Sequence, residues 1–147
     1  MKVEEFMEKD VVTTDPDNDV ATVAELMLNR SVGSVVIVHE NRVAGLITDR
    51  DLLNCLSSAH DAGLCAVSAH MSSPLITVEP QEDLVKAAGL MTEHNIKRVP
   101  VVSTAGLVGI LSFADIAGFL YENAATLAPD LESLAVLIKA GMLHRRS

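Results

Sequence analysis

The sequence contains an internal repeat with an offset of 64 residues. Shifted by that offset, residues 7–52 lie over residues 71–116 without a gap. Most aligned pairs keep apolar against apolar, which predicts two copies of one folded unit. The identical pairs are Met7 and Met71, Thr13 and Thr77, Pro16 and Pro80, Asp19 and Asp83, Ala24 and Ala88, Leu26 and Leu90, Met27 and Met91, Val35 and Val99, Val38 and Val102, Gly45 and Gly109, and Asp51 and Asp115.

Within each copy, the periodicity of the apolar residues changes in the same order. Short β-branched runs at 11–14 and 75–78 end at an acid-proline pair, which is typical of a strand that stops at a turn. A stripe with i, i+3, i+4, i+7 spacing follows and predicts a helix, with Asp19 and Asp83 placed as N-caps. The stripes are Val20, Val23, Ala24 and Met27, and Leu84, Ala87, Ala88 and Met91.

Two apolar runs complete each copy and predict a hairpin, and a final helix is expected to begin near Asp49 and Phe113. The runs are 34–38 with 43–48, and 98–102 with 107–112. The fold class is therefore α/β (α+β), built from two β-α-β-β-α repeats. A unit of about 60 residues buries only about 60% of its unfolded surface. We therefore expect the repeats to pack sheet to sheet with pseudo-two-fold symmetry.

The expected domains are repeat 1 at 1–62, repeat 2 at 63–124 and a C-terminal helical extension at 125–147. The extension is expected because apolar residues lie near one helical stripe after Pro129 and Asp130. It either caps the core or contacts a second subunit or partner. The stripe residues are Leu131, Leu134, Ile138 and Met142.

Charge and hydropathy exclude several classes of partner. Eleven Lys and Arg against 20 Asp and Glu give a net charge of -9, which repels phosphate backbones and argues against nucleic acid. A small anionic ligand stays open, because a local basic cluster or a helix N-terminus can bind phosphate. The longest apolar stretches are too short for a membrane span and no secretory signal is visible, so we expect a cytoplasmic protein without membrane contacts.

Two cysteines and two histidines lie at even spacing: Cys55, His60, Cys65 and His70. The two cysteines fit reduced thiols better than a disulfide framework. Ligands five residues apart do not share one helix face, and zinc pairs usually lie closer in sequence, so the spacing argues against a metal site. No nucleophile with a base beside it stands out, and an enzyme is not expected.

The end of the hairpin carries a hydroxyl residue followed three positions later by an aspartate, as Thr48 with Asp51 and as Ser112 with Asp115. Such a pair can cap a helix for stability alone. A strand that runs into a helix also presents free N–H groups and a hydroxyl, which suit phosphate or ribose oxygens. The aspartate could then accept both hydroxyls of a ribose, at about 1.5–3 kcal/mol for each bond. Capping and ligand binding are compatible.

The two copies differ in where they carry positive charge. Lys97 and Arg98 precede the second strand of repeat 2, and as cleft residues they would supply two cations for phosphates at the Asp115 site. Their alternative is ordinary solvated charge at a helix end. In repeat 1, Arg50 could serve phosphate at the Asp51 site or form a surface ion pair with Asp49 or a nearby acid.

Taken in order, these motifs resemble a tandem pair of CBS (cystathionine-β-synthase) domains over about residues 1–121. The resemblance is carried by the Met7 and Met71 starts, the strand turns at 13–16 and 77–80, the segments 32–35 and 96–100, and the ends at 48–51 and 112–115. It implies two related clefts between the repeats, which in this family commonly bind AMP, ADP, ATP or S-adenosylmethionine as a regulatory ligand and not as a cofactor.

The resemblance assigns roles position by position. Asp51 and Asp115 match the ribose-binding aspartate, and Thr48 and Ser112 match the hydroxyl near ribose or phosphate. The strand-turn threonines match the position that closes the opposite repeat's cleft, and apolar residues around them would hold the adenine. The predicted ligand-binding residues are Asp115, Ser112, Arg98, Lys97, Thr13, Val12, Val99, Pro100, Asp51, Thr48, Arg50, Thr77 and Ile76.

The resemblance implies a non-catalytic regulatory module that senses an adenosine ligand. No catalytic or DNA-binding domain accompanies the pair in this sequence, so we expect it to signal in trans to an unknown effector protein. The family also implies a homodimer. The alternative is a ligand-free module for dimerisation or protein interaction, whose terminal helix carries the contact.

Overall fold

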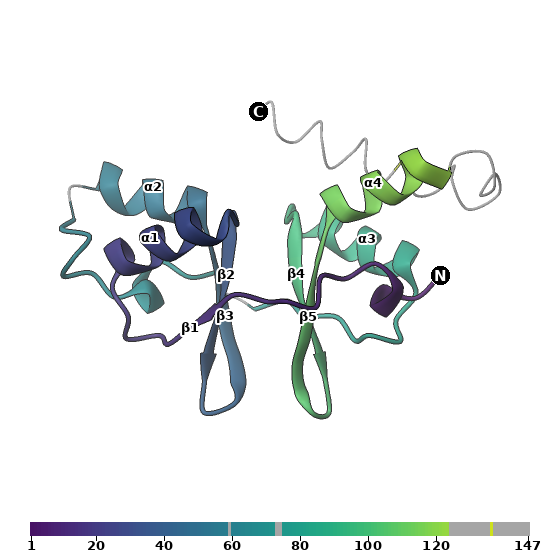
Figure 1. Ribbon diagram of the computed structural model, residues 1–147, viewed down its shortest axis with the longest axis horizontal. Helices are drawn as coiled ribbons and strands as arrows, with labels where there is room; N and C mark the ends of the chain where they lie inside the picture. Colours follow the sequence, from purple (N-terminus) through teal and green to yellow (C-terminus); the bar gives the residue numbers. More distant parts are fainter. Residues whose placement is uncertain (59, 73–74, 124–135, 137–147) are drawn as a thin grey trace. The chain divides into compact units, whose positions relative to one another are not determined.

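In the computed structural model, which describes residues 1–58, 60–72, 75–123 and 136, the first copy has the expected β-α-β-β-α order. β1 pairs in parallel with β2, and β2 pairs antiparallel with β3, which gives the sheet order β1-β2-β3 (Figure 1). The β2–β3 turn has positive φ at Glu40 and Asn41, as a two-residue type I′ turn requires. The elements are β1 (Thr13–Thr14), α1 (Val20–Arg30), β2 (Ser34–His39), β3 (Arg42–Thr48) and α2 (Asp49–Ser57).

The second copy repeats this order with a shorter first strand. Its elements are α3 (Leu84–Glu93), β4 (Arg98–Ser103), β5 (Gly106–Ser112) and α4 (Phe113–Asn123), and β4 pairs antiparallel with β5. In the place of β1, the expected strand at 75–78 is reduced to a single parallel bridge between Val78 and Val101. The β-α-β-β-α order predicted from the repeat is therefore confirmed, although both first strands are shorter than expected.

The two compact units do not coincide with the two sequence repeats, because the segment at the start of each repeat belongs to the unit formed by the other repeat. The first-repeat unit is Asp10–Ile76, and the second-repeat unit joins Met1–Lys9 to the chain from Thr77 onward. Two short 3-10 turns, η1 (Val3–Glu5) and η2 (Val67–Ala69), occupy equivalent places. Equivalent backbone bonds fix each turn: Val67 N to Asn18 O (2.9 Å) and Val20 N to Cys65 O (2.9 Å), and Val3 N to Glu82 O (3.0 Å) and Leu84 N to Met1 O (3.0 Å).

This exchange explains why methionine and glycine recur together in the repeat. A Cβ atom on Gly45 would lie 2.6 Å from Met71 Sδ, and one on Gly109 would lie 2.6 Å from Met7 Sδ. Real Cβ atoms do not approach so closely, so each glycine leaves the space that the methionine of the adjoining leading segment fills. The two identical pairs are thus one packing contact, used once in each unit.

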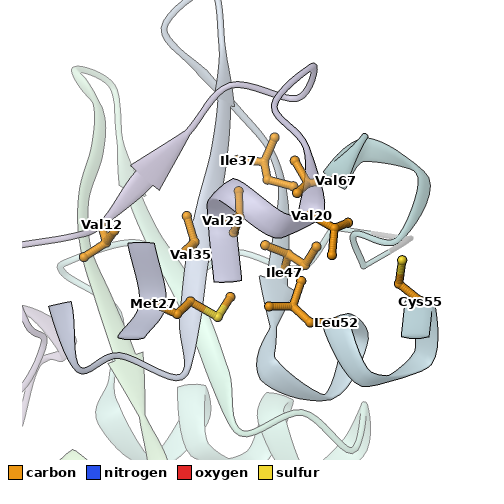
Figure 2. Close-up of a cluster of buried hydrophobic side chains, with 10 residues drawn as sticks. All are labelled: Val12, Val20, Val23, Met27, Val35, Ile37, Ile47, Leu52, Cys55 and Val67. Atoms are coloured by element: carbon orange, nitrogen blue, oxygen red, sulfur yellow. The ribbon is translucent and has the colours of Figure 1, made fainter. Parts of the chain in front are cut away.

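The core of the first-repeat unit lies between its sheet and its helices, as Figure 2 shows. The predicted stripe of α1 is buried there through Val20, Val23 and Met27. The predicted N-caps are also confirmed. Asp19 accepts bonds from Thr22 N at 2.7 Å and Thr22 Oγ1 at 2.8 Å, and these bonds lower the pKa of its carboxyl. Asp83 caps α3 by accepting from Lys86 N at 3.1 Å.

Three expectations from the sequence are not tested by the described structure. The C-terminal extension at 125–147 lies outside the described residues, apart from Val136, which is in a helical conformation. The sheet-to-sheet packing and the pseudo-two-fold symmetry stay predictions, as do the domain boundaries at 62 and 124. Among the described helices, none combines the length and the apolar character needed to cross a bilayer.

Candidate functional site

The end of the first hairpin is closed by a reciprocal cap at the start of α2. Asp51 N donates to Thr48 Oγ1 at 3.4 Å, while Thr48 N and Thr48 Oγ1 donate to Asp51 Oδ2 at 2.8 and 3.0 Å. This is the capping box, with an aspartate at its third position. The stability role predicted for Thr48 and Asp51 is therefore present.

The same box closes the second hairpin at the start of α4. Asp115 N donates to Ser112 Oγ at 3.1 Å, and Ser112 N and Ser112 Oγ donate to Asp115 Oδ2 at 3.2 and 2.7 Å. Asp115 is exposed, whereas Asp51 is half-buried. The duplicated chain thus builds one local geometry twice, in units with different surroundings.

Both capping boxes use a single oxygen of the aspartate. Every bond to each side chain ends on Oδ2, and within the described part of the chain Oδ1 has no hydrogen-bond partner. A carboxylate held on one side keeps its second oxygen, and the remaining lone pairs of the first, for donors from elsewhere. Capping therefore fixes the orientation of the carboxylate without using its full capacity to accept hydrogen bonds.

Two positively charged residues lie beside the second capping box, and the β4–β5 register places one of them, Arg98. Arg98 is the cross-strand partner of Ser112, so their side chains stand on the same face of the sheet. Lys97 precedes β4, and its carbonyl accepts from Phe113 N at 3.0 Å at the start of α4. Both cations are half-buried. The second-repeat unit therefore gathers two cations, a hydroxyl and a carboxylate at one end of its hairpin.

The first-repeat unit has different chemistry at the matching end. Ser34, in place of Arg98, is buried and lies opposite Thr48. Arg50 is exposed on α2, and among the described residues it makes no ion pair within 4 Å, so the surface ion pair considered for it is not formed. The backbone N–H of Arg50 instead donates to Asp49 Oδ1 at 2.9 Å.

The remaining predicted residues lie around the first strand of each copy and on β4. Thr13 is exposed on β1 opposite Val36, and Val12 is 8% exposed just before it. Ile76 is half-buried and Thr77 is exposed. Val99 and Pro100 are buried on β4. Each unit thus brings its own hydroxyl and aspartate together, and the grouping of these other residues around a ligand stays a prediction.

The spacing argument against a metal site fails in the structure. Cys55, His60, Cys65 and His70 do not share a helix: the first is on the last turns of α2, the next two are in the segment after it, and the last ends η2. Because the chain turns back between α2 and η2, one ligand atom from each residue lies within 4.8 Å of the others. The even spacing of the four residues in the sequence was the signal for this cluster. The argument against a metal site assumed that they lie on one helix, and they do not.

A comparison with known protein families matches both halves of the chain. The CBS domain model matches residues 3–58 and again residues 67–122, which together make up most of the chain. The chain belongs to the CBS-domain family. The two matches start 64 residues apart and so coincide with the internal repeat. Stand-alone CBS pairs form a non-catalytic family.

Curated relatives include the CBS domain-containing protein YhcV of Bacillus subtilis. It is 33% identical over 115 residues, which are 78% of this chain and 82% of YhcV. Among solved structures, the CBS domain pair of protein MJ0100, in complex with 5′-methylthioadenosine and S-adenosyl-L-methionine, matches with a TM-score of 0.77 and 23% identity, over 84% of this chain and 98% of that one.

A second solved structure is that of Hypoxic Response Protein I with two coordinated zinc ions. It matches with a TM-score of 0.72 and 26% identity, over 82% of this chain and 99% of that one. Solved structures similar to this chain therefore include one with adenosyl ligands and one with zinc ions.

Proposed function

We propose that this CBS pair is a non-catalytic sensor that binds an adenosine-containing ligand in clefts between its repeats. The observation that carries the proposal is the pair of capping boxes, each of which holds an aspartate by one oxygen. The ribose of the ligand presents two adjacent hydroxyl donors. Asp115, and in the other cleft Asp51, would accept them through Oδ1 and the open lone pairs of Oδ2.

The phosphate groups are assigned to Lys97 and Arg98. Two half-buried cations beside a helix start are suited to an anionic ligand, even in a chain with a net charge of -9. The equivalent end of the first-repeat unit offers only the exposed Arg50. We therefore propose that the Asp115 site takes AMP, ADP or ATP, and that the Asp51 site binds charged nucleotides more weakly.

The adenine is assigned to the apolar residues beside the strand turns. Val12 and Thr13 would close the Asp115 site from the opposite repeat, together with Val99 and Pro100. Ile76 and Thr77 would do the same at the Asp51 site, as in the family pattern. The solved complex of MJ0100 with adenosyl ligands supports this class of ligand.

The function is tested by comparing adenosine, AMP and ATP on the wild-type chain and on Arg98→Ala. We expect all three to raise the melting temperature of the wild type, with the phosphorylated ligands binding more tightly. Loss of a charged hydrogen bond costs about 1.5–3 kcal/mol, so Arg98→Ala should weaken AMP binding about 10- to 100-fold and leave adenosine unchanged.

Arg42→Ala is the matched control, because Arg42 is exposed at the opposite end of a hairpin, across from His39. It should bind all three ligands like the wild type. If none of them shifts the melting temperature of the wild type, or if Arg98→Ala weakens adenosine and AMP equally, the assignment is wrong.

A second candidate function, an interaction module, has one specific observation in its favour. Helix α2 leaves Leu53 and Leu56 exposed at 63% and 58%, on a helix whose other side is buried through Leu52 and Cys55. Exposed apolar side chains of this kind suit a contact with another protein chain. We propose that α2 contributes to a homodimer and that the ligand state of the pair is passed to an effector protein in trans.

A further inference from the structure

We propose that Cys55, His60, Cys65 and His70 form a structural zinc site in the first-repeat unit. The four residues supply two sulfur and two nitrogen ligands, and one ligand atom from each lies within 4.8 Å of the others. Two thiolates and two imidazoles are a set that zinc binds as a closed tetrahedron. The proposal is independent of the nucleotide site, because none of the four residues belongs to either capping box.

The distances between the ligand atoms are close to those of a tetrahedral zinc site. With zinc bonds of about 2.3 Å to sulfur and 2.0–2.1 Å to nitrogen, neighbouring ligand atoms lie about 3.3–3.8 Å apart. Cys65 Sγ is 2.9 Å from His70 Nε2 and 3.9 Å from His60 Nδ1. The two rings are tilted by 58°, with centroids 5.4 Å apart. Small side-chain rotations would bring the set to bonding distance.

The charges of the cluster also suit the metal. Cys55 is buried, and Cys65 is partly buried. Zinc would bind both sulfurs as thiolates, and their two protons would pass to solvent. Two thiolates and two neutral imidazoles around Zn²⁺ make a site with no net charge, which is the form that burial favours.

The second-repeat unit shows what this position does without a metal. At an offset of 64 residues, Cys55 corresponds to Phe119 and His70 corresponds to Phe6. These two rings pack edge to face, with centroids 4.5 Å apart and an interplanar angle of 84°. Each unit thus joins its last helix to the segment around its 3-10 turn at the same place. The second-repeat unit uses an aromatic pair, and we infer that the first-repeat unit uses zinc.

The segment after α2 is one that a metal would stabilise. His60, Asp61, Gly63 and Leu64 are exposed, so this stretch buries little apolar surface of its own. It still supplies backbone acceptors to the start of α1, at Ala62 O and Cys65 O. Because all four coordination positions are filled by protein, the site has no open position for substrate. A structural role follows.

The proposal is tested by metal titration of the full chain, purified under reducing conditions and stripped with a chelator. Co²⁺ should bind one ion per chain, with the intense visible bands of a tetrahedral site and thiolate-to-cobalt charge-transfer bands. Zn²⁺ should then displace it. His60→Ala changes an exposed residue and should fold normally. It should bind Co²⁺ more than about 100-fold more weakly, because loss of a group that only supports a metal ligand already costs about 10- to 100-fold in affinity.

His39→Ala is the matched control, since His39 is an exposed histidine of the same unit and not of the cluster. It should bind Co²⁺ like the wild type. A second variant, Cys55→Phe with His70→Phe, copies the aromatic pair and should lose all zinc dependence of its melting temperature. The proposal is overturned if the reduced wild type takes up no tetrahedral Co²⁺, or if His60→Ala binds it as tightly as the wild type.

Discussion

Asp115→Ala should remove most of the rise in melting temperature that AMP gives the wild-type chain. At a ligand concentration about 100 times the dissociation constant, one bound ligand stabilises the native state by about 2.7 kcal/mol. The Asp115 site is expected to supply most of this stabilisation for AMP, because it has the cations Lys97 and Arg98. Differential scanning fluorimetry with and without saturating AMP measures the effect.

The control for this variant must separate ligand binding from helix capping. Asp83 is an exposed aspartate of the same unit that caps α3 through Lys86 N. Asp83→Ala and Asp115→Ala each remove a cap, at about 0.5–2 kcal/mol, so both should melt earlier without ligand. Only Asp83→Ala should keep the AMP shift. A full AMP shift in Asp115→Ala would show that its carboxylate does not contact the ligand.

Ile47→Ala should destabilise the first-repeat unit by about 2–5 kcal/mol, because it opens a cavity among residues that the structure buries completely. Ile47 is 0% exposed on β3 and belongs to the core cluster in Figure 2. A small domain has only about 5–15 kcal/mol of stability, so this loss is a large part of the total. Urea denaturation followed by circular dichroism measures it.

Leu28→Ala serves as the control for the core variant. Leu28 is an apolar residue of the same unit on α1 but is 81% exposed, and its replacement should change the free energy of unfolding by less than about 0.5 kcal/mol. If Ile47→Ala were as stable as Leu28→Ala, the packing assigned to β3 would be incorrect.

The elements that were predictable from the sequence are those specified by local pattern. The α1 stripe, both N-caps and both hairpins follow from side-chain spacing, which is a property of each short segment. The first strands are shorter than expected. β1 forms only two residue pairs with β2, and the strand at 75–78 is a single bridge. A β-branched run indicates that a strand is favourable and does not set how much of it finds a partner.

Features that depend on contacts between distant segments were harder to predict from the sequence. The repeat shows that two units exist, but a period of 64 residues can be divided at any starting point. The pairing of Met1–Lys9 with the second repeat therefore does not follow from it. The cluster of Cys55, His60, Cys65 and His70 depends on a chain reversal after α2. Of the proposed ligand site, the capping boxes were predictable from the sequence, whereas the finding that Oδ1 of each aspartate is open required the three-dimensional structure.

We propose that a carboxylate binds the two hydroxyls of a ribose. Calorimetric titration tests this claim by comparing AMP with 2′,3′-dideoxy-AMP, which lacks both hydroxyls. Two lost bonds to a charged acceptor, at about 1.5–3 kcal/mol each, predict a loss of affinity of at least about 100-fold in the wild type. In Asp115→Ala, the altered site should bind both nucleotides equally weakly. Equal affinity of the wild type for AMP and its dideoxy form would contradict the account.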